Sequence, residues 1–229
     1  MERHFDTELK DLNNDILKIG TLAQGAIYKS IESLKGRDKD MAKSVIEDDK
    51  KIDELELVID EKCLDLIARH QPMAKDLRFI TTEMKLNNEL ERIADIAVDI
   101  AQRVLELVDK PLLKPLEDIP RLTSVAQDMV KTAIDAFIKG DIELARKVLL
   151  ADPEADRLRN SIQKELVEEY MVKDGSTSPR AVQLLLIARF LERICDHATN
   201  IAEDIIYMVK AEVVKHHPER LKEGEGGRV

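Results

Sequence analysis

The chain has little of what disulfide-bonded, secreted or membrane-spanning proteins require. Its 229 residues include two cysteines, which is too few for a disulfide framework. No apolar run approaches the ~20 residues of a membrane span. The N-terminus is charged from Glu2 onward, which excludes a typical secretory signal. We therefore expect a soluble, cytoplasmic protein without a membrane span.

Aromatic residues, glycine and proline are also scarce. Aromatics make up 3% of the chain, tryptophan is absent, and there are eight glycines and seven prolines against 36% charged residues. This composition is typical of helix bundles. The net charge is −10, whereas a nucleic-acid phosphate backbone needs basic patches. We expect no nucleic-acid partner.

Apolar residues recur every three or four positions through six segments, which predicts six long helices. The expected ranges are 5–35, 39–70, 74–108, 120–139, 142–172 and 180–214. Gly36 and Gly140 are helix terminators, and Asp38 and Asp141 are suited to cap the helices that follow. Pro153 predicts an irregularity within the fifth helix. Because the connections are short, neighbouring helices should pack antiparallel.

The two halves of the chain repeat one pattern. The segment Leu90-Glu91-Arg92-Ile93-Ala94-Asp95 returns 101 residues later as Leu191-Glu192-Arg193-Ile194-Cys195-Asp196, and residues 22–45 match residues 125–148. We therefore predict an all-α fold of two tandem, pseudo-symmetric three-helix bundles. The first should span residues 1–113 and the second residues 114–217, with a disordered tail at 218–229.

The repeated segment carries carboxylates on one helical face. At 100° per residue, Glu91, Asp95 and Asp99 lie within about 80° of one another, opposite the apolar positions. Like charges four residues apart repel by roughly 0.2–0.5 kcal/mol per pair. A ladder retained in two copies despite that repulsion suggests a bound cation.

A second acidic pair precedes each ladder. Asp49 and Asp53 match Asp152 and Asp156 at an offset of 103 residues, on helices that should be hairpin neighbours of the ladders. Carboxylate oxygens suit iron, manganese and magnesium, with zinc also possible, and four carboxylates can bridge several ions. The candidate metal ligands are Asp49, Asp53, Glu91, Asp95 and Asp99 in the first half, and Asp152, Asp156, Glu192, Asp196, Asn200 and Glu203 in the second.

The alternative interpretation is a solvated acidic face, since charge runs usually serve solvation. Glu56 extends the acidic stripe, but its counterpart is Arg159, so we interpret Glu56 as surface charge. Arg92 and Arg193 should form salt bridges within their own helices. The two cysteines, Cys63 and Cys195, face the apolar side and should belong to the core.

Signatures of enzymes are missing from the sequence. There is no Gly-rich phosphate loop, no G-x-S-x-G and no H-E-x-x-H. We expect a protein that is not an enzyme. A metal-dependent hydrolase or oxidase that uses the carboxylates, and a bare helical scaffold, remain as alternatives.

These motifs together resemble those of the PhoU family of phosphate-uptake regulators. The residues that carry the resemblance are Gln71-Pro72, Asp76-Leu77-Arg78, the run from Leu90 to Asp95 and the run from Leu191 to Glu203. Ala94 and Cys195 stand where the family commonly has glycine. The resemblance extends over almost the whole chain, from about residue 5 to residue 215.

The resemblance implies a negative regulator of the phosphate-starvation response. Such a regulator would act between the ATPase subunit of a phosphate transporter and a phosphate sensor histidine kinase, commonly as a homodimer. It also implies multinuclear iron or zinc clusters at paired acidic motifs. In this sequence those motifs are Asp49 with Asp53, Glu91 with Asp95, Asp152 with Asp156, and Glu192 with Asp196.

Overall fold

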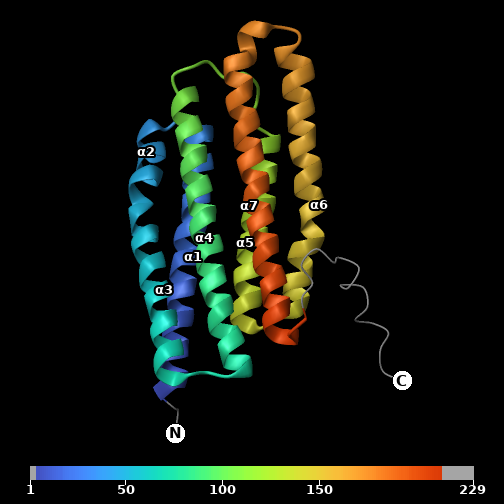
Figure 1. Ribbon diagram of the computed structural model, residues 1–229. Helices are drawn as coiled ribbons and strands as arrows, with labels where there is room; N and C mark the ends of the chain where they lie inside the picture. Colours follow the sequence, from blue (N-terminus) through green and yellow to red (C-terminus); the bar gives the residue numbers. More distant parts are fainter. Residues whose placement is uncertain (1–3, 213–229) are drawn as a thin grey trace, which may run out of the picture.

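The computed structural model describes residues 4–212, and within that range the regular structure is entirely helical. Figure 1 shows two helical bundles side by side. In each bundle the long rods that follow one another along the chain run in opposite directions, with α2 and α3 forming a single rod. This confirms the predicted fold class. The first bundle contains α1 (His4–Gly36), α2 (Lys39–Asp48), α3 (Lys50–His70) and α4 (Ala74–Leu107), and the second contains α5 (Asp118–Lys139), α6 (Ile142–Glu165) and α7 (Ser178–Lys210).

The predicted second helix is interrupted at Asp49, which separates α2 from α3. Asp49 keeps right-handed helical dihedrals, so α2 and α3 continue in line as one rod (Figure 1). The carbonyl of Asp49 accepts hydrogen bonds from the amides of Ile52 (2.7 Å) and Asp53 (3.1 Å). In the other half Pro153, which follows Asp152, lies inside α6 and provides no amide donor. α6 nevertheless runs unbroken from Ile142 to Glu165, so the irregularity predicted at Pro153 does not interrupt the helix.

The predicted fifth helix, 142–172, changes character near its end. Its α-helical part stops at Glu165 and continues as a π-helical turn, Leu166–Met171. A short 3-10 turn, Gly175–Thr177, then leads into α7, and the side chain of Asp174 caps it by accepting from the amide of Ser176.

The predicted aspartate caps are both present. Oδ1 of Asp38 accepts from the amides of Asp40 and Met41, and Oδ1 of Asp141 accepts from those of Glu143 and Leu144. These bonds satisfy amides that the first helical turn leaves without partners.

The left-handed residue before each cap differs between the halves. Gly140 has φ +60°, as expected for a glycine stop, but in the first half the left-handed residue is Arg37, with φ +55°, rather than Gly36. The guanidinium of Arg37 donates to the carbonyls of Val108 (2.6 Å) and Lys110 (2.7 Å). These bonds tie the end of α1 to the end of α4.

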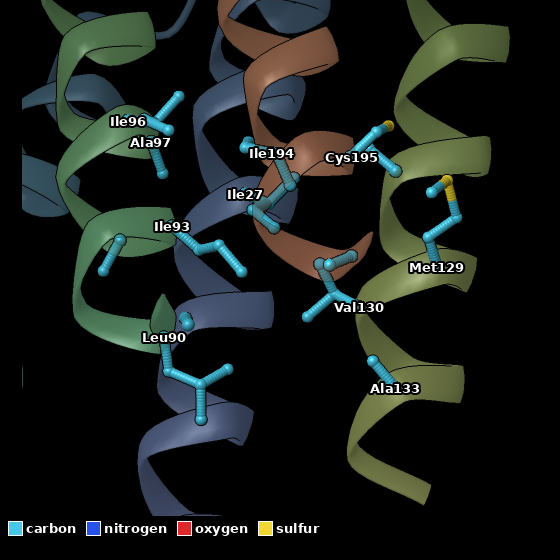
Figure 2. Packing of buried hydrophobic residues seen from close by; sticks show 14 of the residues in the cluster. Ile27, Leu90, Ile93, Ile96, Ala97, Met129, Val130, Ala133, Ile194 and Cys195 are labelled. Atoms are coloured by element: carbon cyan, nitrogen blue, oxygen red, sulfur yellow. The ribbon is translucent and has the colours of Figure 1, made fainter. Parts of the chain in front are cut away.

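The hydrophobic core extends across both halves. Buried side chains from α1, α4, α5 and α7, including Ile27, Leu90, Val130 and Ile194, meet at the centre of the molecule (Figure 2). The segment 108–117 connects the halves, so the proposed boundary at residue 113 falls within it. That the two halves are separate folding units stays a prediction, and the predicted tail at 218–229 lies outside the described residues.

One buried carboxyl group interrupts the core of the first bundle. Glu83 on α4 has no exposed surface, and neither of its carboxyl oxygens has a hydrogen-bond partner. Burial, reinforced by the charge of Asp15, raises the pKa of Glu83 to about 9. Leu184 occupies the equivalent position in the second bundle and is also buried. Glu83 is therefore protonated in the folded protein at neutral pH.

Replacing Glu83 with leucine should stabilise the protein by about 1–3 kcal/mol at pH 7, because a buried carboxyl without partners is costly. The pKa of this carboxyl is about 9 in the folded protein, against 4.5 when unfolded. As pH rises through that interval, the unfolded chain loses the proton while the folded chain keeps it, so Glu83 destabilises the folded protein increasingly. Urea unfolding at about pH 6, 7.5 and 9 should show the gain from Glu83→Leu growing with pH. The Glu83→Gln variant, which is neutral at every pH, is the control. A gain for Glu83→Leu that stays constant with pH would contradict this account.

Candidate metal centres

The first acidic cluster lies between the α2–α3 rod and α4. Asp49, at the junction of α2 and α3, has its pKa raised to about 6 by burial and by the charges of Asp53 and Asp95. The charge of Asp95 on α4 contributes to this shift, so Asp49 and Asp53 face the ladder on α4. That these carboxylates hold a metal ion stays a prediction.

Glu91 and Asp95 belong to the same cluster. Burial raises the pKa of Glu91, and the charges of Asp95, Glu56 and Asp53 raise it further, while Arg92 opposes them. Burial likewise raises the pKa of Asp95, followed by the charges of Asp53 and Asp99. The interpretation of Glu56 as mere surface charge was incomplete, because this half-buried side chain adds to the negative potential at Glu91.

The second cluster lies between α6 and α7. Burial raises the pKa of Asp152, and so do the charges of Asp156 and Glu192. The pKa of Asp196 is raised to about 6 by burial and by the charges of Glu192, Asp152 and Asp156. All four predicted carboxylates of this half are therefore brought together.

A cation from the protein itself enters the second cluster. Nη2 of Arg159 on α6 lies 3.1 Å from Oε1 of Glu192 and 3.6 Å from Oδ1 of Asp156. Arg159 is the counterpart of Glu56, so the two clusters have opposite charges at this position. The sequence repeat shows that Arg159 replaces Glu56, but only the structure shows that Arg159 pairs with Glu192.

The outer candidates, Asp99 and Asn200, face the seam between α4 and α7. Nδ2 of Asn200 donates to Oε2 of Glu89 on α4 at 3.2 Å, and Nδ1 of His197 lies 2.5 Å from the same oxygen. Asp99 lines a groove of about 380 Å³ on this seam with Arg193 and His197. Glu203 lies less than one turn beyond Asn200 on α7 and is half-buried.

Glu89 was missed by the sequence argument, which followed only the ladder face. It lies about 160° from Glu91 on α4, and His197 lies about 140° from Glu192 on α7. Glu89 and His197 therefore lie at the borders of the apolar faces of α4 and α7. That placement could have predicted a contact between the two helices. The pairing of Glu89 with His197 and Asn200 joins the two bundles beside both clusters.

The remaining sequence predictions concern cysteines and arginines. Cys63 and Cys195 are fully buried, as predicted for core residues, and burial raises the pKa of both thiols. Arg92 donates from Nε to Oδ1 of Asn88 at 3.0 Å instead of pairing directly with Asp95. Its charge nevertheless opposes part of the rise in the pKa of Asp95.

The chemistry of both clusters is that of oxygen donors. In the part of the chain from residue 4 to 212, no three His, Cys, Asp or Glu side chains are already arranged to hold a metal ion. The clusters are therefore close sets of partly exposed carboxylates rather than closed coordination shells.

Fold and site together define a class: an all-α repeat protein with an acidic cluster in each half. A family model described as the PhoU domain matches residues 16–104 and again residues 119–205. The chain belongs to the PhoU family. Within residues 4–212, no helix combines the length and apolar character needed to cross a membrane.

Individual relatives agree with this assignment. The chain is 35% identical to the phosphate-specific transport system accessory protein PhoU homolog 2 of Thermotoga maritima, over 100% of this chain and 97% of that protein. It is 35% identical to the accessory protein PhoU of Escherichia coli, over 93% and 88%. The crystal structure of PhoU from Pseudomonas aeruginosa superposes with a TM-score of 0.87 at 36% identity, covering 91% of this chain and 100% of that one.

The raised pKa of Asp49 predicts how the metal-free protein responds to pH. The folded carboxyl binds its proton more tightly than the unfolded one, with a pKa of about 6 against 3.8, so its unfavourable effect shrinks as pH falls through this range. In chelator-treated protein, Asp49→Asn should raise the melting temperature by a few degrees at about pH 7.5. At about pH 5 it should have roughly half that effect, and at about pH 3.5 very little.

Thermal unfolding at these pH values tests this directly. Asp11→Asn, which removes an exposed carboxylate from α1, is the matched control and should change the melting temperature little at any of them. Equal effects of Asp49→Asn at pH 5 and pH 7.5 would rule out the ionised Asp49 carboxylate as the cause.

Proposed function

We propose that this protein is a cytoplasmic regulator of phosphate uptake that represses the phosphate-starvation response when phosphate is plentiful. Its partners in this role are the ATPase subunit of a phosphate transporter and a phosphate sensor histidine kinase. The observation that carries the proposal is the full-length match to accessory proteins of phosphate-specific transport systems. The two acidic clusters and the absence of catalytic motifs from the sequence support it.

Metal binding at the acidic clusters is a second part of the proposal. The residues fit a cation by their chemistry, because each half presents four carboxylates on two neighbouring helices. Burial and neighbouring carboxylates raise the pKa values of Asp49, Glu91 and Asp95 in one half, and of Asp152 and Asp196 in the other. The core ligands would be Asp49, Asp53, Glu91 and Asp95 in one half, and Asp152, Asp156, Glu192 and Asp196 in the other. Iron, zinc and manganese suit this donor set, and magnesium is a further candidate. A bound cluster supplies positive charge that joins each pair of helices.

The chain's own residues favour a regulatory role over hydrolysis or oxidation. A metal hydrolase needs an acid or base beside the metal-bound substrate. His197, which lines the same groove as Glu91 and Asp95, is engaged with Glu89 at the seam between α4 and α7. Glu91 and Asp95 line the open groove beside Arg193 and His197, where a change in charge is accessible to a docked protein.

Deleting the gene should derepress phosphate-scavenging genes in cells that grow in high phosphate. Reintroducing the wild-type chain should restore repression, and a tagged chain should recover the transporter ATPase or the sensor kinase from membranes of phosphate-replete cells. The free chain should elute as a homodimer. Unchanged expression after deletion, with normal levels of both partners, would count decisively against the regulatory proposal.

Loading with iron, zinc or manganese should raise the melting temperature. At a hundredfold excess over the dissociation constant, binding to the folded state adds about 2.7 kcal/mol, or roughly 5–10 °C for a chain of this size. Asp95→Asn should reduce that gain, whereas Asp128→Asn, on the exposed face of α5, should retain it. Elemental analysis that finds no metal, with no melting shift, would leave the clusters as solvated surface.

A further inference from the structure

We propose that Arg159 is a built-in cation of the second acidic cluster and lowers the affinity of that cluster for metal ions. The two clusters would then differ in metal occupancy although their four core carboxylates match. This inference rests on the metal binding proposed above. It identifies the position, Glu56 in the first half and Arg159 in the second, whose charge sets the metal affinity of each cluster.

The contacts of Arg159 are those of a bound counter-ion. Its guanidinium lies 3.1 Å from Glu192 and 3.6 Å from Asp156, so it joins one carboxylate from α7 to one from α6. The side chains of Arg159 and Glu192 are only 28% and 18% exposed, and charge pairs that are shielded from water interact more strongly than surface pairs. Any metal ion at Glu192 must therefore compete with a guanidinium that is already bound.

The first cluster provides an internal comparison. Glu56 stands at the position of Arg159, and its charge reaches Glu91, the counterpart of Glu192. One cluster therefore gains a negative charge where the other gains a positive one. A divalent ion entering the first cluster meets an additional carboxylate, whereas an ion entering the second meets a cation.

The guanidinium of Arg159 also has a hydrogen-bond partner other than the carboxylates of the cluster. Its Nη1 donates to Oδ1 of Asn160 at 2.6 Å, which is a partner outside the four core carboxylates. A groove of about 170 Å³, lined by Gln163, Leu185 and Glu192 among others, opens beside the guanidinium. The second cluster can therefore accept metal if the guanidinium withdraws from Glu192, and the withdrawal weakens metal binding by the strength of the lost ion pair.

The test is a charge exchange at this position, with Zn²⁺ and Mn²⁺ as probes. In a background where Asp53→Asn and Asp95→Asn disable the first cluster, Arg159→Glu should tighten metal binding by about tenfold or more. In the complementary background, Asp156→Asn with Asp196→Asn, Glu56→Arg should weaken binding to the first cluster by a similar factor. Competition titration gives the affinities, and elemental analysis gives the number of ions per chain.

Arg157→Glu is the matched control. Arg157 lies two residues away on α6, its side chain is 77% exposed, and it pairs with the exposed Glu154 at 3.9 Å. It undergoes the same change of charge without touching Glu192 and should alter the metal affinity far less. Arg159→Glu should also lower the melting temperature of metal-free protein and recover the loss when metal is added. A merely structural arginine would lower it in both states.

The outcomes separate this inference from the function on which it rests. If the chain with both clusters intact binds metal, but Arg159→Glu changes the affinity no more than Arg157→Glu does, then the inference is wrong and metal binding stands. If neither the wild-type chain nor any variant takes up Zn²⁺ or Mn²⁺, the proposed metal binding is overturned, and the role of Arg159 with it.

Discussion

The central contact among α1, α4, α5 and α7 is the constraint on which the rest of the structure depends. α4 and α7 each bury one apolar face there, and Leu90, Ile93 and Ile194 lie within it (Figure 2). A helix that buries one face in a core keeps its other faces for polar contacts with neighbouring helices. On α4 the carboxylates of the first cluster meet the α2–α3 rod while Glu89 meets α7, and on α7 the carboxylates of the second cluster meet α6. The positions of both acidic clusters follow from this packing.

Charge repulsion within each cluster opposes the same packing. Burial, followed by the charges of neighbouring carboxylates, raises the pKa values of Asp49 and Asp196 to about 6, so their ionised forms are unfavourable in the folded protein. A protein selected only for stability would not keep such groups together, and functional sites are where proteins tolerate local destabilisation. The hydrophobic core of both halves supplies the stability that makes the clusters tolerable.

The repeat preserves the backbone while its polar chemistry diverges. Glu83 in the first half and Leu184 in the second occupy equivalent positions of the repeat, and so do Glu56 and Arg159. Neither exchange disturbs the helices that carry it, since helix position is set by the apolar stripe and the caps. The two bundles can therefore be equivalent as folds and different as sites.

The sequence by itself determined the helical class, the repeat, the caps at Asp38 and Asp141, and the four acidic pairs. Helical periodicity and capping are local properties, and a repeat can be read along the chain. Only the tertiary structure decided that Arg159 reaches Glu192, that Asn200 turns toward Glu89, and that Glu83 is sealed from water without a partner. These contacts join different helices, and their formation depends on the rotation and spacing of packed helices, which periodicity along one chain does not encode.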